Sequence, residues 1–168
     1  MLATALVAAV AAPSAPASTR DRAVALTSLE RGVLADINAF RAANHLGPLR
    51  VSASLTEAAR RHSQQMEADG YFAHSSFDGT AFWKRIKAFY PSGGYGFWSV
   101  GENLVWEEPD LDAGEALRLW MASPPHRHNI LDPQWREIGV SALHVTGAPS
   151  VFGGEDVTVI TTDFGARL

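Results

Sequence analysis

Two histidines lie one residue apart in SPPHRHNIL (residues 123–131), directly after a pair of prolines. Proline is tolerated in the first turn of a helix, so the prolines predict a short helix that starts there and runs to the end of the stretch. Helix positions two apart point about 200° away from each other, so only one of His126 and His128 can face a given cleft. Ser123 and Asn129 lie three residues on either side of His126, roughly on its face. We therefore expect His126 to face polar groups, and His128 to face elsewhere.

A carboxylate occurs in the otherwise largely apolar segment VGENLVW (residues 100–106), whose pattern predicts an extended strand. Because side chains alternate along a strand, Glu102 would share a face with apolar residues such as Val100 and Leu104. A carboxylate on an apolar face is costly unless it is hydrogen-bonded, ion-paired or bound to a metal. Glu102 therefore either holds backbone groups in place or meets a cation or an imidazole, and the sequence leaves both alternatives open.

The remaining histidines differ in their surroundings. His74 follows the predicted end of a helix at Gly70, where a loop can bring a side chain into a cleft; the alternative is an exposed loop imidazole. His62 lies on the apolar stripe of the same predicted helix, which favours a core histidine that is hydrogen-bonded to a carbonyl. His45 and His144 have no suggestive neighbours, and we assign them no role.

Secondary-structure signals predict the helices and strands that carry these residues. Helical spacing and capping motifs predict helices that start at TSLE (27–30) and SLTE (54–57) and stop at Gly47-Pro48 and Gly70, a third over 82–89, and a fourth that opens at 112–115. The β-branched segments 137–145 and 157–164 predict an antiparallel pair. Helices first and strands mostly late predict an α+β layer structure in which helices cover a small sheet.

A glycine-rich segment with three aromatic residues occupies positions 92–98, SGGYGFW. This composition is typical of a surface loop, which would act as a lid or as a plain connection. Tyr95, Phe97 and Trp98 are the candidate ligand contacts in it, and ordinary packing is the alternative role for their rings.

Composition limits the class of protein. The 168 residues are 46% hydrophobic and predict one domain, which we place at residues 27–168. Segment 1–26 begins small and apolar and then turns Pro/Ser/Ala-rich, which is typical of a secretory signal or a disordered tail and predicts a secreted or cell-surface protein. No later run is long enough to span a membrane. The 14 Lys and Arg residues are scattered and the net charge is −4, so nucleic acid is excluded as a partner. The absence of cysteine excludes disulfides, cysteine-based zinc sites and thiol nucleophiles.

Several motifs together resemble a known family. In chain order they are His74 after an aromatic residue, GENL (101–104), WMASPPHRHNIL (120–131), IGV (138–140) and DFG (163–165). Their order is similar to that of the CAP superfamily, which comprises cysteine-rich secretory proteins, antigen 5 and pathogenesis-related proteins and is also described as the SCP-like extracellular domain. The likeness extends from about Leu29 to Gly165 and is to the disulfide-free bacterial branch. It implies a three-layer α-β-α sandwich with a small, mainly antiparallel sheet.

The resemblance also implies a central cleft lined by two histidines and acidic residues, which in some members binds a divalent metal. Matched by position, the histidines are His74 and His126 and the first acid is Glu102, so these three are the expected ligands for zinc or another divalent cation. Ser123 stands where many eukaryotic members carry a second glutamate. The loss of that carboxylate predicts weaker metal binding.

Two functions follow from these expectations. The first is a secreted protein whose cleft, with Ser123 among its residues, binds an extracellular lipid, cell-wall glycan or protein. The alternative is a metal-dependent hydrolase in which His74 and His126 hold the ion and Glu102 ligates it or activates water. A metal-free variant with Ser123 as nucleophile and His126 as base is disfavoured, because Ser-Pro is a common helix start and no oxyanion hole is evident.

Overall fold

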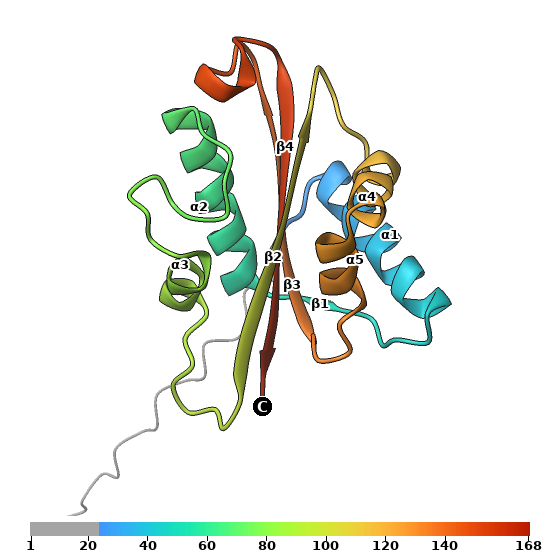
Figure 1. The fold of residues 1–168 in the computed structure, drawn as a ribbon. Helices are drawn as coiled ribbons and strands as arrows, with labels where there is room; N and C mark the ends of the chain where they lie inside the picture. The colour runs from blue at the N-terminus through green and yellow to red at the C-terminus, as the bar shows by residue number, and fades with distance from the viewer. Residues whose placement is uncertain (1–23) are drawn as a thin grey trace, which may run out of the picture.

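A four-stranded sheet separates the helices into two layers in the computed structural model, which describes residues 24–168 (Figure 1). The strand order is β1-β3-β4-β2, with β1 parallel to β3 and the other neighbours antiparallel. The strands are β1 Arg50–Val51, β2 Trp98–Glu107, β3 Glu137–Val145 and β4 Val157–Arg167. This architecture confirms the predicted α+β sandwich with a small, mainly antiparallel sheet.

Helices cover both faces of the sheet. α2 and α3 lie on one face, and α1, α4 and α5 lie on the other (Figure 1). Their bounds are α1 Ser28–Ala43, α2 Ala53–Asp69, α3 Phe82–Phe89, α4 Ala113–Ala122 and α5 Pro124–Leu131, with a 3-10 turn, η1, at Ser150–Phe152. Segments far apart in the chain therefore flank the same strands, which is what a cleft built from distant residues requires.

Most helix starts agree with the capping motifs. Thr27 and Glu30 form the predicted capping box of α1, and Asp112 caps α4. The predicted start of α2 at SLTE is wrong: the helix begins at Ala53 after Ser52. The N–H of Ser52 still donates to the carbonyl of Ile138 in β3, so the strand hydrogen bonds continue to the residue that directly precedes the helix.

The predicted stop of the first helix is also too late. α1 ends at Ala43, because His45 takes a left-handed backbone conformation with φ of 61°. The guanidinium of buried Arg41 donates hydrogen bonds to the carbonyl of Gly47, in the turn after α1, at 3.0 Å and to the carbonyl of Ile130, in α5, at 2.7 Å. The end of α1 is thereby tied to the end of α5.

The core lies on both faces of β4, the inner strand that pairs with β2 and β3. Phe164 and Ile160 pack in the cluster beneath α1 and α4, whereas Val157 and Val159 face the other way. Beside β4, a Cβ on Gly139 would lie 2.0 Å from the backbone carbonyl carbon of Leu55, so the backbone of α2 rests directly on β3. The glycine sets the height of α2 above the sheet.

Strand β2 forms one edge of the sheet and carries polar residues on both faces. Glu102 lies opposite Asp163 of β4, on the α2 and α3 side. Asn103 points to the other side and donates to the carbonyl of His126 in α5. The edge strand thus connects the two helical layers at one point.

Two expectations concern other parts of the chain. Within residues 24–168, no helix is long and apolar enough to cross a membrane. Residues 1–23 of the signal-like segment lie outside the described residues, so that expectation stays a prediction.

Candidate functional site

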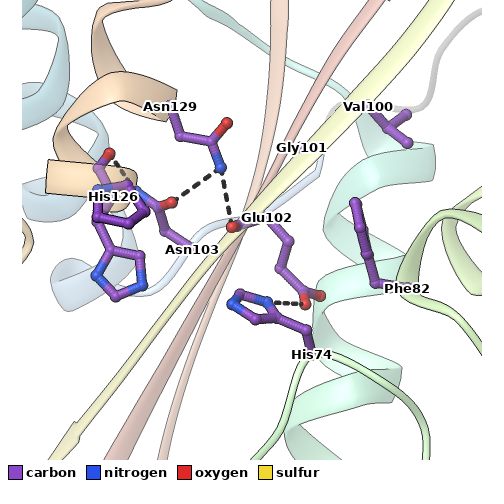
Figure 2. Close-up of a pocket in the computed structure, with 9 residues that line it drawn as sticks. His74, Phe82, Val100, Gly101, Glu102, Asn103, His126 and Asn129 are labelled. Atoms are coloured by element: carbon purple, nitrogen blue, oxygen red, sulfur yellow. Dashed lines mark hydrogen bonds and ion pairs between the residues drawn. The ribbon is translucent and has the colours of Figure 1, made fainter. Parts of the chain in front are cut away.

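A cavity of about 320 Å³ opens beside the edge strand β2 (Figure 2). Its lining residues are His74, Phe82, Val100, Gly101, Glu102, Asn103, Pro125, His126 and Asn129. His74 reaches it from the loop after α2, on one side of the sheet, and His126 from α5, on the other. The two imidazole centroids are 6.5 Å apart. The sheet ends at β2, so the two side chains can approach each other past its edge.

Glu102 pairs with an imidazole and a cation at once. Its Oε1 accepts a hydrogen bond from Nδ1 of His74 at 2.8 Å, and its Oε2 accepts one from Nη2 of Arg85. The side chains of Glu102 and Arg85 are 1% and 5% exposed, so each buried charge is balanced by the other. Arg85 also donates to the backbone carbonyl of His74 at 2.9 Å, which fixes the loop. Of the two alternatives for Glu102, the structure shows the second, because its carboxylate meets both an imidazole and a cation, and the backbone of the loop is held by Arg85 instead.

The contact with Glu102 orients His74. A carboxylate can only accept, so Nδ1 of His74 carries a proton. Nε2 points away from Glu102, on the side where His126 lies (Figure 2). The side chain of His74 is 50% exposed, so this nitrogen is accessible to a molecule in the cavity. A carboxylate behind an imidazole is an arrangement that also serves general bases.

The α5 side of the cavity is held by amide hydrogen bonds. Nδ2 of Asn129 donates to the carbonyl of Glu102 and to Oδ1 of Asn103, both at 3.0 Å. His126 also lines the cavity from α5, and burial, followed by the nearby His74, lowers its pKa below 6.5. His126 is therefore a neutral imidazole at pH 7, which can either donate or accept a hydrogen bond.

The sequence prediction distinguished correctly between the neighbouring residues of α5. His126 and Asn129 line the cavity together, whereas His128 is exposed and does not. Ser123 sits at the junction of α4 and α5 and is not among the lining residues, so its place in the cleft stays a prediction.

Two buried titratable residues lie behind Glu102. Nε2 of His62 donates to the carbonyl of Ala73 at 2.9 Å, which confirms the predicted core histidine. Burial lowers the pKa of His62 to about 4, so it is neutral. Asp163 is fully buried opposite Glu102, and burial, followed by the charge of Glu102, raises the pKa of its carboxyl well above the usual range. Both shifts disfavour further charge behind the Glu102–Arg85 pair.

Sequence reasoning missed Arg85 and left Asp163 without a role. The signal for Arg85 is a charged residue next to Ile86 in the short helix FWKRIKAF, where both residues are buried. For Asp163 the signal is an acid in a β-branched strand that is buried along nearly its whole length. Both signals indicate a buried ionisable group, but neither identifies the group that it contacts.

The aromatic candidates lie apart from the cavity lining. Tyr95 and Phe97 are 45% and 39% exposed in the loop before β2. Trp98 belongs to β2 rather than to the predicted loop, because it pairs with Arg167. Its Nε1 donates to the carbonyl of Tyr90 at 2.9 Å. Contact of these rings with a ligand stays a prediction, and Tyr95 and Phe97 are the accessible pair.

The donor set does not match the needs of a divalent metal. In the described part of the chain, no group of three or more His, Cys, Asp or Glu side chains is arranged to hold an ion. Glu102 already accepts from His74 and Arg85, which leaves two imidazoles for a metal that takes at least three protein ligands. As arranged here, the three residues do not form a complete metal site. Metal binding by His74, Glu102 and His126 therefore stays a prediction, which titration with a divalent cation tests.

Comparison with known proteins identifies relatives. Residues 34–155 match the model of the cysteine-rich secretory protein family, CAP. The uncharacterised protein YkwD of Bacillus subtilis (strain 168) is 32% identical over 115 residues, which cover 68% of this chain and 42% of YkwD. The uncharacterised membrane protein YlbC of the same organism is 27% identical, over 68% of this chain and 31% of its own length. The chain thus spans less than half the length of these curated relatives.

Solved structures share the fold. An outer surface protein of Borrelia burgdorferi superposes with a TM-score of 0.66 at 20% identity, covering 82% of this chain and 92% of that protein. An extracellular protein with an SCP domain from Bacillus anthracis gives a TM-score of 0.60 at 24% identity, over 86% of this chain and 45% of that one. At these identities the likeness concerns the fold alone.

Proposed function

The chain belongs to the cysteine-rich secretory protein (CAP) family, and from that premise we propose that it acts outside the cell as a binding protein whose His74–Glu102–His126 cavity takes a polar ligand. The observation that carries the proposal is the convergence of two imidazoles, from opposite faces of the sheet, on one cavity backed by Glu102. An extracellular location agrees with the outer-surface and extracellular proteins that share the fold.

The chemistry of the lining favours a ligand that forms hydrogen bonds. Nε2 of His74 and the neutral ring of His126 both offer hydrogen-bonding nitrogens, and neither has a partner among the described residues. An acyl chain in the cavity would remove these groups from water without replacing their hydrogen bonds, which is costly. Phe82 and Val100 add an apolar wall. A peptide or glycan satisfies both kinds of surface, whereas a lipid chain satisfies one.

Three probes separate the ligand classes left open by the sequence. Purified peptidoglycan, a random peptide mixture and phosphatidylglycerol vesicles would each be tested for binding to the full chain. The decisive variant is His126→Ala, and His128→Ala is its matched control because that residue lies on the same helix away from the cavity. We expect His126→Ala to lose binding to peptidoglycan or peptide and His128→Ala to keep it. Equal binding by both variants, or binding to vesicles alone, would overturn the proposal.

A hydrolase is the second candidate, and the Glu102–His74 contact favours it. A proton held on Nδ1 leaves Nε2 of a neutral His74 able to accept a proton from water or from a substrate hydroxyl. The candidate predicts hydrolysis of dye-labelled peptidoglycan or casein by the full chain, lost in His74→Ala. If the substrate is bound but not cleaved over a day, the domain is a binding protein without this activity.

A further inference from the structure

The backbone of β2 has a free edge within the cavity. Among the strands of residues 24–168, β2 pairs with β4 alone, so its other edge faces away from this sheet. Four consecutive residues of this strand, 100–103, line the cavity. An edge strand presents backbone N–H and C=O groups that can pair with another extended chain.

The hydrogen bonds show which residues of β2 point outward. In an antiparallel pair, the N–H and C=O of one residue point the same way, and alternate residues point to opposite edges. Phe97 exchanges both backbone bonds with Leu168 beyond the end of β4, so it points inward. The carbonyls of Glu102 and Leu104 accept from Asn129 and Trp120 of the helical layer, so these residues point outward. Val100, in the same alternation, also points outward.

Two outward carbonyls in the middle of the strand are capped by side chains, and, among the residues that the structure describes, the outward groups of Val100 next to them are free. The side chains of Asn129 and Trp120 occupy the carbonyls of Glu102 and Leu104, at 3.0 Å each. Within residues 24–168, no group outside β2 partners the N–H or C=O of Val100 or the N–H of Glu102. Free backbone groups of Val100 and Glu102 therefore lie in the wall of the cavity.

The walls of the cavity suit an extended chain. A strand added to β2 would lie about 4.8 Å from it, and its side chains would alternate between the two faces of the sheet. One set would meet His74 and Phe82, and the other would meet His126 and Pro125. Capping by Asn129 and Trp120 limits the pairing to the stretch around Val100.

From this geometry we infer that the ligand of the cavity is an extended peptide, which pairs with the backbone of Val100 and Glu102 as an added strand between His74 and His126. The inference rests on the proposed binding function and specifies the class of its ligand. Main-chain pairing supplies sequence-independent affinity, and the two histidine-bearing walls select the side chains.

The edge position allows a backbone group to be deleted by substitution. The N–H of Val100 points away from β4, so Val100→Pro removes a donor to the ligand while keeping the pairing within the sheet. Val100→Ala is the matched control, because it shortens the same side chain and keeps the N–H. Thermal unfolding of both variants shows whether the fold is retained.

The probe is a heptapeptide selected from a random displayed library on the full chain, with counter-selection on His126→Ala. We expect Val100→Pro to weaken its affinity roughly tenfold more than Val100→Ala does. A peptide N-methylated at the bonds that face β2 should lose affinity to a similar extent, and this test needs no protein variant. Equal affinities for Val100→Pro and Val100→Ala, together with unchanged binding of the N-methylated peptide, would overturn the inference.

The outcomes also separate this inference from the function on which it rests. If the library yields no peptide and peptidoglycan binds in a His126-dependent manner, the cavity is a binding site, but the inference that its ligand is an extended peptide is wrong. If no probe depends on His126, the proposed function itself fails.

Discussion

Removing the charge of Glu102 should destabilise the domain strongly, because it strands a buried cation. In Glu102→Gln, Arg85 stays buried, since its side chain is 5% exposed, and it keeps only neutral acceptors, the carbonyl of His74 and the hydroxyl of Ser76. Breaking a buried ion pair by removing one partner costs about 3 to 5 kcal/mol. The neutral acceptors place the expected loss of unfolding free energy at about 3 kcal/mol, which lowers Tm by roughly 10 °C in a domain of this size.

A double-mutant cycle tests whether the loss comes from the pair. Urea unfolding of the wild type, Glu102→Gln, Arg85→Met and the double variant gives the coupling free energy. We expect the double variant to cost at least about 1.5 kcal/mol less than the sum of the single variants, because neither charge is then left alone. The exposed pair Glu115 and Arg118 is the control: its side chains are 46% and 65% exposed, so Glu115→Gln should change stability by less than about 0.5 kcal/mol. Additive losses at Glu102 and Arg85 would refute the reasoning.

Three further predictions concern the same region. The pKa of His62 is about 4 in the folded state and about 6.5 in the unfolded state, so the unfolded state binds more protons between these pH values. The free energy of unfolding should therefore fall as pH falls through that window, by at most roughly 3 kcal/mol. Urea unfolding between pH 7 and 4 should show this loss relative to His62→Gln, and parallel pH profiles for the two proteins would contradict it. Gly139→Ala should destabilise by more than about 3 kcal/mol in thermal unfolding, because the added Cβ would lie 2.0 Å from the α2 backbone; a near-neutral result would mean that α2 does not rest on β3. Calorimetric titration of the chelator-treated chain with Zn²⁺ should show weak binding that is lost in His74→Ala/His126→Ala, and tight stoichiometric binding would show that Glu102 leaves its partners to serve as a ligand.

Local periodicity explains why part of the site was predictable. The choice of His126 over His128 rested on the angle between helix positions and on the polar residues Ser123 and Asn129 near its face, and His126 and Asn129 do line the cavity together. The face of Glu102 followed from alternation along a strand, which β2 obeys. Which way a side chain points depends on the helix or strand that carries it, so it can be predicted without knowing which elements pack around it.

The missed features depend on which elements become neighbours. The pairing of Arg85 with Glu102 joins α3 to β2, and nothing in either segment identifies the other. The two residues of β1 are too few for a periodic signal, and the start of α2 followed from its pairing. The edge position of β2 follows from the strand order, which no single segment contains. The sequence thus predicted the carboxylate of Glu102 on an apolar face and the orientation of His126, but the neighbours that complete the cavity come from the tertiary fold.

The most direct test of the central claim is long-range ¹H–¹⁵N spectroscopy of the histidine rings of the full chain, with and without the peptidoglycan or peptide that it retains. The free protein should show His74 protonated on Nδ1 and His126 neutral at pH 7. On addition of the ligand, the ring nitrogens of His74 and His126 should shift together, while those of exposed His128 stay in place. A saturable ligand that shifts neither His74 nor His126 would show that binding occurs elsewhere and would contradict the account.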